Sequence, residues 1–128
     1  MFNHSVSALV SSIKNGIIAK RSTVSVYKSN IVESILKVLK DNGYILNYTK
    51  DVDSKFLSIH LKYHVGRSSI SDISVISKPS RRVYCKFNDI PVVYDGLGIV
   101  ILSTSKGVLC SVDSNNLKVG GELLLKVF

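Results

Sequence analysis

The chain has 128 residues, of which 45% are hydrophobic, so it can bury a core and is too apolar to be a disordered tail. Its 17 lysines and arginines exceed its 9 acidic residues, and the formal net charge of +8 favours polyanionic partners such as nucleic acids. A basic domain without such a partner is the alternative on charge alone. No apolar run approaches the roughly 20 residues that a membrane helix needs, and two cysteines make no disulfide framework. We therefore expect no membrane partner and a reducing compartment.

The first part of the chain begins with a helix and a strand. Apolar residues recur at intervals of three and four from Val6 to Ile17, which predicts an amphipathic helix with Ser5 as its cap and Gly16 near its end. The alternating β-branched residues that follow predict a strand over residues 23–27.

A second helix and two strands follow. Ser29 and Asn30 both offer caps, and Asn30 with Glu33 has the spacing of a capping box. Gly43 has the position expected just beyond a helix. Residues 44–48 and 56–63 predict two strands joined by a polar turn at residues 51–54. The first region is therefore predicted to be an α-β-α-β-β domain of two layers.

A polar connection around Gly66 and Arg67 predicts a domain boundary, so we assign residues 1–66 and 67–128 to separate domains. Beyond it, residues 70–76, 83–87 and 123–128 read as strands, and residues 111–117 as a short helix. The second domain is mostly β, and the predicted fold class is α+β.

The most informative stretch lies within the second domain. Asp95-Gly96 is a turn signal, and residues 99–102 are the apolar, partly β-branched sequence of a strand buried on both faces. The sequence then changes to Ser103-Thr104-Ser105-Lys106-Gly107, which places three hydroxyls and one ammonium group at the exit of that strand. Such a loop suits phosphates, sugar hydroxyls or base edges.

Signals for catalysis, metals and cofactors are weak. Ser103 and Lys106 have the Ser-x-x-Lys spacing of some acyl-transfer enzymes, which leaves a small hydrolase as an alternative, but the accompanying motifs are missing. The histidines and cysteines have no metal-site spacing, and Gly96-Leu97-Gly98 lacks the third glycine of a dinucleotide-binding loop. We predict no catalytic residues, no metal, no cofactor and no small-molecule substrate.

Several motifs, taken together, resemble the bacterial-type family of small-subunit ribosomal protein eight. They are Ile13-Lys14-Asn15-Gly16, Ser77-Lys78-Pro79 with Arg82-Val83-Tyr84, Ile90-Pro91, the stretch from Gly96 to Gly107, and Gly120-Gly121-Glu122. The resemblance covers nearly the whole chain and is strongest after Ile76. It implies a non-enzymatic protein that binds the central domain of small-subunit ribosomal RNA and supports subunit assembly and translation. It also implies neighbouring ribosomal proteins, among them protein five of the small subunit.

The resemblance also implies which residues contact RNA. Ser103, Thr104, Ser105, Gly107 and Gly121 would contact it or shape the loop, and Lys106 would contact a phosphate. Glu122 would accept from a base amino group or anchor the serine loop.

Three further positions have open alternatives. Tyr84 would stack on a sugar or base, or pack against the core. Lys14 and Asn15, at the end of the first helix, would lie near RNA or be solvated. The same surface would also suit a repressor that binds a messenger resembling the ribosomal site.

The sequence departs from the family pattern at several points. It reads Ser80-Arg81-Arg82 where the family has Gly-Leu-Arg, so Arg82 keeps the usual basic position, as an expected RNA-binding residue, and Arg81 adds a charge. Tyr27 replaces a proline before the second helix. This drift, with the abundance of Ile, Lys, Asn and Ser, predicts an organelle-encoded protein of the mitochondrial matrix; a bacterial cytoplasm or another organelle is the alternative.

Overall fold

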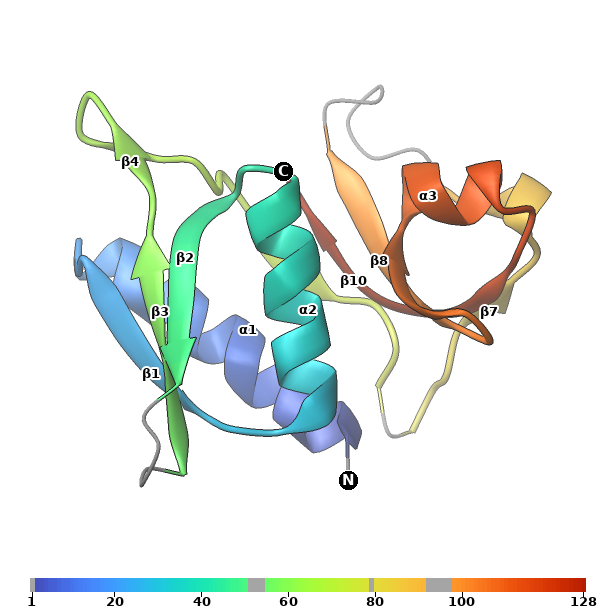
Figure 1. Ribbon diagram of the computed structural model, residues 1–128, viewed down its shortest axis with the longest axis horizontal. Coiled ribbons are helices and arrows are strands. Elements are labelled where there is room, and N and C mark those ends of the chain that lie inside the picture. The colour runs from blue at the N-terminus through green and yellow to red at the C-terminus, as the bar shows by residue number, and fades with distance from the viewer. Residues whose placement is uncertain (1, 51–54, 79, 92–97) are drawn as a thin grey trace. The chain divides into compact units, whose positions relative to one another are not determined.

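The structure, a computed structural model, describes residues 2–50, 55–78, 80–91 and 98–128 (Figure 1). The chain divides into two compact units, Met1–Ser71 and Asp72–Phe128, and each unit contains its own sheet. The predicted turn at residues 51–54 and the Asp95-Gly96 turn signal lie outside the described residues. No helix in the described ranges is long and apolar enough to cross a membrane.

The first unit is built from two helices and a three-stranded antiparallel sheet in the order β1-β3-β2. Its main elements are α1 (Phe2–Ile18), β1 (Thr23–Tyr27), α2 (Asn30–Asp41), β2 (Ile45–Lys50) and β3 (Phe56–Leu61). A short hairpin of β4 (Tyr63–His64) and β5 (Arg67–Ser68) follows. The predicted α-β-α-β-β order is confirmed.

The two helices and one face of this sheet enclose the core of the first unit. Alternate residues of β1 and β3 are buried, and their neighbours in each strand are more exposed, as expected for a sheet with one covered face. The helices supply apolar residues at helical spacing. The buried apolar residues of the unit are Val6, Leu9, Val10, Ile13, Val24, Val26, Val32, Ile35, Leu36, Leu39, Ile45, Leu57, Ile59, Leu61 and Ile70.

The predicted start of α1 is wrong, whereas one of the two caps predicted for α2 is confirmed. Helix α1 begins at Phe2, so Ser5 lies within it, because residues 2–4 contain no glycine or proline to stop a helix. Helix α2 is capped by Ser29, whose Oγ accepts a hydrogen bond from the Val32 N–H at 3.3 Å. The predicted capping box of Asn30 and Glu33 therefore does not form.

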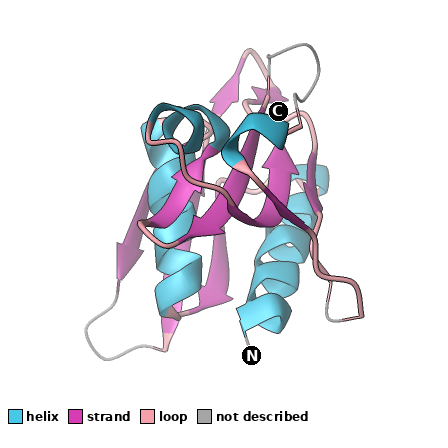
Figure 2. Ribbon diagram, turned by 90° about the vertical axis from the view of Figure 1, so that its right-hand side faces the viewer, coloured by secondary structure: helices cyan, strands magenta, loops and turns pink. Residues whose placement is uncertain are grey.

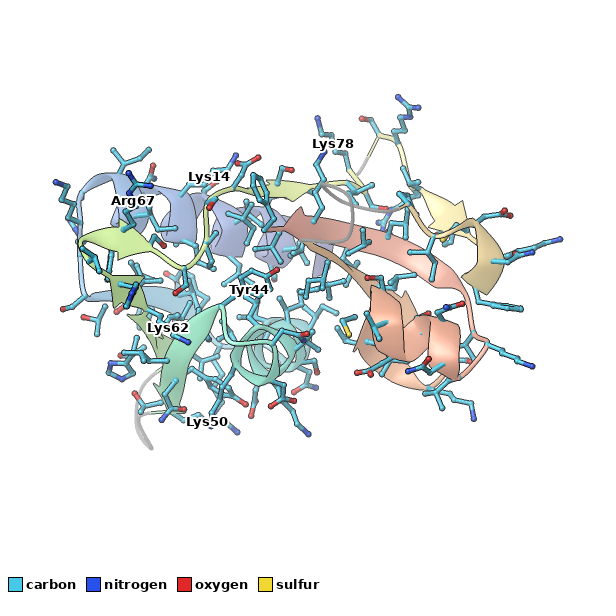
Figure 3. The ribbon with its side chains drawn as sticks, turned by 90° about the horizontal axis from the view of Figure 1, so that it is seen from above. Lys14, Tyr44, Lys50, Lys62, Arg67 and Lys78 are labelled. Carbon is cyan, nitrogen blue, oxygen red and sulfur yellow. The ribbon has the colours of Figure 1, made fainter. Side chains whose placement is uncertain are left out.

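Glu33 is paired with another element. Its carboxylate lies 2.6 Å from Nζ of Lys50, at the end of β2 (Figure 3). The hydrogen bond and the charge of Glu33 raise the pKa of Lys50 above its ordinary value.

The predicted end of α2 is confirmed. Gly43 has a φ of +78°, and its N–H donates to the carbonyl of Lys40 at 3.0 Å. The N–H of Tyr44 donates to the carbonyl of Leu39 at 2.9 Å, which completes a Schellman motif.

The second unit is mostly β, with one short α-helix among its described residues (Figure 2). Its elements are β6 (Ile73–Val75), β7 (Tyr84–Cys85), the 3-10 helix η1 (Phe87–Asp89), β8 (Ile99–Thr104), β9 (Gly107–Cys110), α3 (Ser111–Asn116) and β10 (Gly121–Val127). The predicted α+β fold class is confirmed.

Strand β10 lies at the centre of this sheet. The order is β6-β10-β8-β9, and β7 also pairs with β10, beyond the end of β6. All these pairs are antiparallel, and a register shift occurs between Leu123 and Leu125. Val100, Leu102 and Leu123 form a buried cluster, against which Ile76, Val83, Cys85, Ile90 and Phe128 pack.

Prediction and structure differ in strand length within this unit. Residues 70–76 and 83–87 contribute only three-residue and two-residue strands. Lys78 pairs with Arg81 in an isolated bridge between them, and Phe87 enters η1. The predicted buried strand at residues 99–102 is confirmed and extends to Thr104. Strand β9 had not been predicted.

Candidate nucleic-acid interface

The predicted serine loop is the two-residue turn of a hairpin between β8 and β9. Thr104 pairs with Gly107 across the turn, which leaves Ser105 and Lys106 at the tip. The Thr104 Oγ1 accepts a hydrogen bond from the Lys106 N–H at 3.1 Å and donates one to the Gly107 carbonyl at 2.7 Å. The Thr104 hydroxyl therefore holds the turn in one shape, while the side chains at the tip are exposed.

Gly107 has a φ of +108°, a conformation that residues with a side chain rarely adopt. Its surroundings are open, since a Cβ added there would meet no atom within 4 Å. Backbone conformation, not lack of space, is what requires a glycine at this position.

Gly121 lies at the start of β10, between Cys85 of β7 and Thr104 of β8. A Cβ at Gly121 would overlap the carbonyl oxygen of Ser103, and one at Gly120 would overlap the carbonyl oxygen of Cys85. The glycine pair therefore allows β10 to pass between two backbones. Gly121 shapes the strand that leads to the site.

Glu122 is buried in β10, opposite Ser103 of the strand that leads into the serine loop. Its residue is only 6% exposed, and its carboxylate forms an ion pair with the Arg82 guanidinium at 3.2 Å. Ser103 of β8 and Tyr84 of β7 are its direct cross-strand neighbours. Because paired residues of antiparallel strands share a face, Tyr84, Glu122 and Ser103 form one row across three strands.

Tyr84 is the exposed end of this row, with 68% of its surface accessible. Such a ring presents a face on which a base or sugar can stack. Arg82 reaches the row from the chain just before β7. The structure thus brings together Arg82, Tyr84, Glu122 and Ser103, with the turn at Ser105 and Lys106 two residues beyond Ser103.

Ser77 is a supporting residue that sequence reasoning did not single out. It is 3% exposed, and its Oγ accepts from the Val83 N–H at 3.0 Å and donates to the Val83 carbonyl at 3.3 Å. Lys78 and Arg81 exchange backbone hydrogen bonds of 2.8 and 2.9 Å within the turn that Ser77 closes. Arg81 and Arg82 are exposed at this turn. The motif Ser77-Lys78-Pro79 was the sequence signal for the turn.

Lys14 and Asn15 belong to the first unit. Both are exposed on α1, and Lys14 projects from the helix (Figure 3). Asn15 lines a cavity of about 420 Å³ with Ser12, Gly16, Ala19, Arg21, Val24 and Ser25. Gly16 is buried against Val24, whose side chain would overlap a Cβ there, so close packing of α1 on β1 explains this glycine.

The described residues contain no group of three or more His, Cys, Asp or Glu side chains placed to hold a metal ion. Burial of Cys85, together with the charge of Asp89, raises the pKa of its thiol, which is unfavourable for a nucleophile. Cys110 is buried, and both cysteines are free thiols.

Comparison with known proteins shows to which class this basic α+β chain belongs, namely the structural proteins of the small ribosomal subunit. The family model described as Ribosomal protein S8 matches residues 4–128. The chain belongs to this family, and the predicted resemblance is confirmed. The family is one of structural, non-enzymatic proteins, so the prediction of no enzymatic activity is confirmed as well.

Three bacterial relatives illustrate the similarity, each described as "Small ribosomal subunit protein uS8". That of Wolbachia sp. subsp. Brugia malayi is 46% identical over 126 residues, which cover 97% of this chain and 96% of the relative. That of Rhodospirillum centenum is 44% identical over 123 residues, covering 94% and 93%. That of Nitratidesulfovibrio vulgaris is 43% identical over 129 residues, covering all of both chains.

Proposed function

We propose that the protein is a structural constituent of the small ribosomal subunit that binds the central domain of its ribosomal RNA through the second unit. The observation that carries this proposal is the row of Tyr84, Glu122 and Ser103 beside the exposed turn at Ser105 and Lys106. Membership of the family supports the ribosomal setting. Binding would stiffen an RNA junction and so support assembly and translation.

The binding energy and the specificity come from different groups. Lys106 and Arg81 neutralise phosphates, which gives salt-dependent affinity. The hydroxyls of Ser103 and Ser105 contact sugar or base edges in a minor groove, where RNA is recognised by shape. Thr104 holds the turn before RNA arrives, so little conformational freedom is lost on binding.

Glu122 is the buried member of this row. Its carboxylate orients the Arg82 guanidinium toward the row and neutralises part of that charge. Arg82 then supplies a fixed donor, in contrast to the mobile ammonium of Lys106. Gly107 and Gly121 act by permitting the backbone path.

The setting has two further parts. Lys14 and Asn15 make a second RNA contact from the first unit, and other small-subunit proteins, protein five among them, are its neighbours.

The compartment is the mitochondrial matrix, on the grounds of composition and drift of the motifs. The relatives named above are bacterial. Fractionation of source cells tests the compartment, and recovery with cytoplasmic ribosomes would contradict it.

The test of function is titration of the central-domain RNA with the purified protein over a series of salt concentrations. Ser105→Ala should weaken binding about tenfold with the salt slope unchanged, because it removes a neutral contact. Lys106→Gln should lower the slope by about one. Lys126→Gln, at the opposite end of β10, is the matched control and should change neither quantity.

Equal binding to unrelated RNA, with Ser105→Ala indistinguishable from the wild type, would overturn the proposal. Tighter binding to a messenger segment, competing with the ribosomal RNA, would instead favour the translational repressor.

A further inference from the structure

An exposed aromatic pair lies in the first unit. Tyr27, at the end of β1, is the direct cross-strand partner of Phe56, at the start of β3. Their ring centroids are 4.6 Å apart, with 30° between the ring planes. Tyr27 is nevertheless 70% exposed and Phe56 41% exposed.

Support of the sheet explains only part of this arrangement. A cross-strand aromatic pair stabilises a strand end by roughly 0.2–1 kcal/mol. A smaller residue at position 27 would leave less apolar surface in water, and burial, not exposure, is the favourable state of an aromatic ring. A ring that is stacked on one neighbour, with most of its surface in water, can stack on a second planar group through its exposed surface.

Each of the two aromatic residues has an exposed lysine as its neighbour in the chain. Lys28 follows Tyr27 and Lys55 precedes Phe56, both are exposed, and the Lys28 N–H donates to the Lys55 carbonyl at 2.8 Å. The backbone pairing of β1 and β3 thus continues into this lysine pair. Two exposed, flexible lysines whose backbone adjoins an aromatic pair favour a partner that is both aromatic and anionic.

A cavity of about 510 Å³ adjoins the pair and is lined by both rings. Its walls combine apolar groups with hydroxyls, the latter from Ser5 and Ser12 of α1 and Ser25 of β1; the other lining residues are Ala8, Leu9 and Val26. Its volume lies within the range of small-ligand sites, about 300–1,000 Å³. Hydroxyls at such positions can donate to and accept from the edge of a base.

We propose that Tyr27 and Phe56 form a stacking platform for an unpaired base of single-stranded RNA. Lys28 and Lys55 bind the phosphates that flank this base, and the serine hydroxyls contact its edge in the adjoining cavity. An apolar peptide would fill the cavity but would not use the lysine pair, and the net charge of +8 further favours RNA. The choice of RNA as the ligand rests on the proposed function. The platform itself includes no residue of the second unit.

The test exploits the absence of tryptophan from the chain. Tyr27→Trp introduces a single indole whose fluorescence reports stacking directly. We expect saturable quenching by a short single-stranded oligoadenylate, and weaker quenching by an oligouridylate of equal length, because purines stack more strongly. Quenching that is equally small for both oligonucleotides would overturn the proposal.

Affinity measurements with the oligoadenylate provide the variant series. Tyr27→Ala should weaken binding about tenfold with the salt slope retained, whereas Lys28→Gln should lower the slope by about one. Leu46→Ala, which removes another exposed apolar side chain from β2 at the other edge of this sheet, is the control and should change neither. A loss of affinity in Leu46→Ala as large as that in Tyr27→Ala would overturn the proposal.

The outcome is distinguishable from that of the proposed function. If Ser105→Ala weakens binding to the central-domain RNA but Tyr27→Ala leaves the affinity for the oligoadenylate unchanged, the platform alone is refuted. In assembled small subunits, a photoreactive benzophenone amino acid at position 27 should crosslink to RNA. Crosslinking to a protein would assign the cavity to a protein neighbour and overturn the proposal.

Discussion

Arg82 and Glu122 form an ion pair of 3.2 Å although 40 positions separate them in the sequence. The carboxylate side chain is 7% exposed and the guanidinium side chain 36% exposed, so one partner is buried and the other reaches the surface. The pair joins the turn before β7 to the central strand β10. Removal of the arginine would leave a buried carboxylate without this partner, which is costly.

Arg82→Gln should therefore lower the free energy of unfolding by about 1–3 kcal/mol, less than the 3–5 kcal/mol of a fully buried pair because Arg82 is partly exposed. Glu122→Gln should cost less, because the amide oxygen still accepts a hydrogen bond and no buried charge is stranded. Urea denaturation measures both, and Lys86→Gln is an exposed control. A greater cost for Glu122→Gln than for Arg82→Gln would contradict this account.

Gly121→Ala and Gly107→Ala should act differently although both replace a glycine of the candidate site. At position 121 the methyl group overlaps the Ser103 carbonyl, so β8 and β10 must separate, at a cost of about 1–3 kcal/mol. At position 107 space is open and only the positive φ opposes alanine, at about 1–2 kcal/mol.

Hydrogen exchange separates the two glycine variants. Faster exchange should spread along β8 and β10 in Gly121→Ala and stay within the turn in Gly107→Ala. Equal exchange patterns in the two variants would argue against a backbone overlap at Gly121.

Gly16 and Val24 should be energetically coupled. Alanine at position 16 would overlap Cγ1 of Val24, so Gly16→Ala should destabilise the first unit despite the roughly 1 kcal/mol that alanine gains over glycine within a helix. Val24→Ala alone should also destabilise it by leaving a void. The double variant should be more stable than the sum of the two changes predicts, because the second methyl group then occupies the space vacated by the valine. Simple additivity in denaturation experiments would show that α1 and β1 can move apart at no cost.

Cys85 should be slow to alkylate at neutral pH. Burial, and secondly the charge of Asp89, raise the pKa of its thiol, so the thiolate forms only at a pH above that of a free cysteine. Because the folded pKa is raised, the stabilisation linked to this proton is complete below the unfolded pKa and is lost as pH rises through the folded value.

Asp89→Asn should move the pH profile of Cys85 alkylation partway back toward that of a free thiol, since burial remains. Iodoacetamide labelling followed by peptide mapping measures this and separates Cys85 from the buried Cys110. An unchanged profile in Asp89→Asn would leave burial as the whole cause.

Local patterns were sufficient for much of the fold. Helix α2 followed from the helical spacing of its apolar residues, because only one face is buried. Strand β8 followed from a continuous apolar run, because both of its faces are buried. Strand β9 did not, since Gly107 and the polar turn before it are typical of a loop, and four residues are too few to show alternation. The sequence left the cap of α2 open between Ser29 and Asn30, because both are good capping residues, and the structure uses Ser29.

The candidate site was predictable only in part. The exposed turn was visible as an abrupt change from apolar residues to hydroxyls after Leu102. The neighbours of Glu122 were not visible, because they depend on the register of β10 with β7 and β8, and no local pattern records that register. The RNA contacts of these residues stay predictions.

The central position of β10 has a consequence for biosynthesis. The strands β6, β7 and β8 all hydrogen-bond to β10, yet all of them leave the translating ribosome before it does. A nascent chain arrested before Gly121 can complete the sheet of the first unit but not that of the second. Protease resistance should therefore arise in two stages during synthesis, and the candidate RNA-binding row should form only after β10 has emerged.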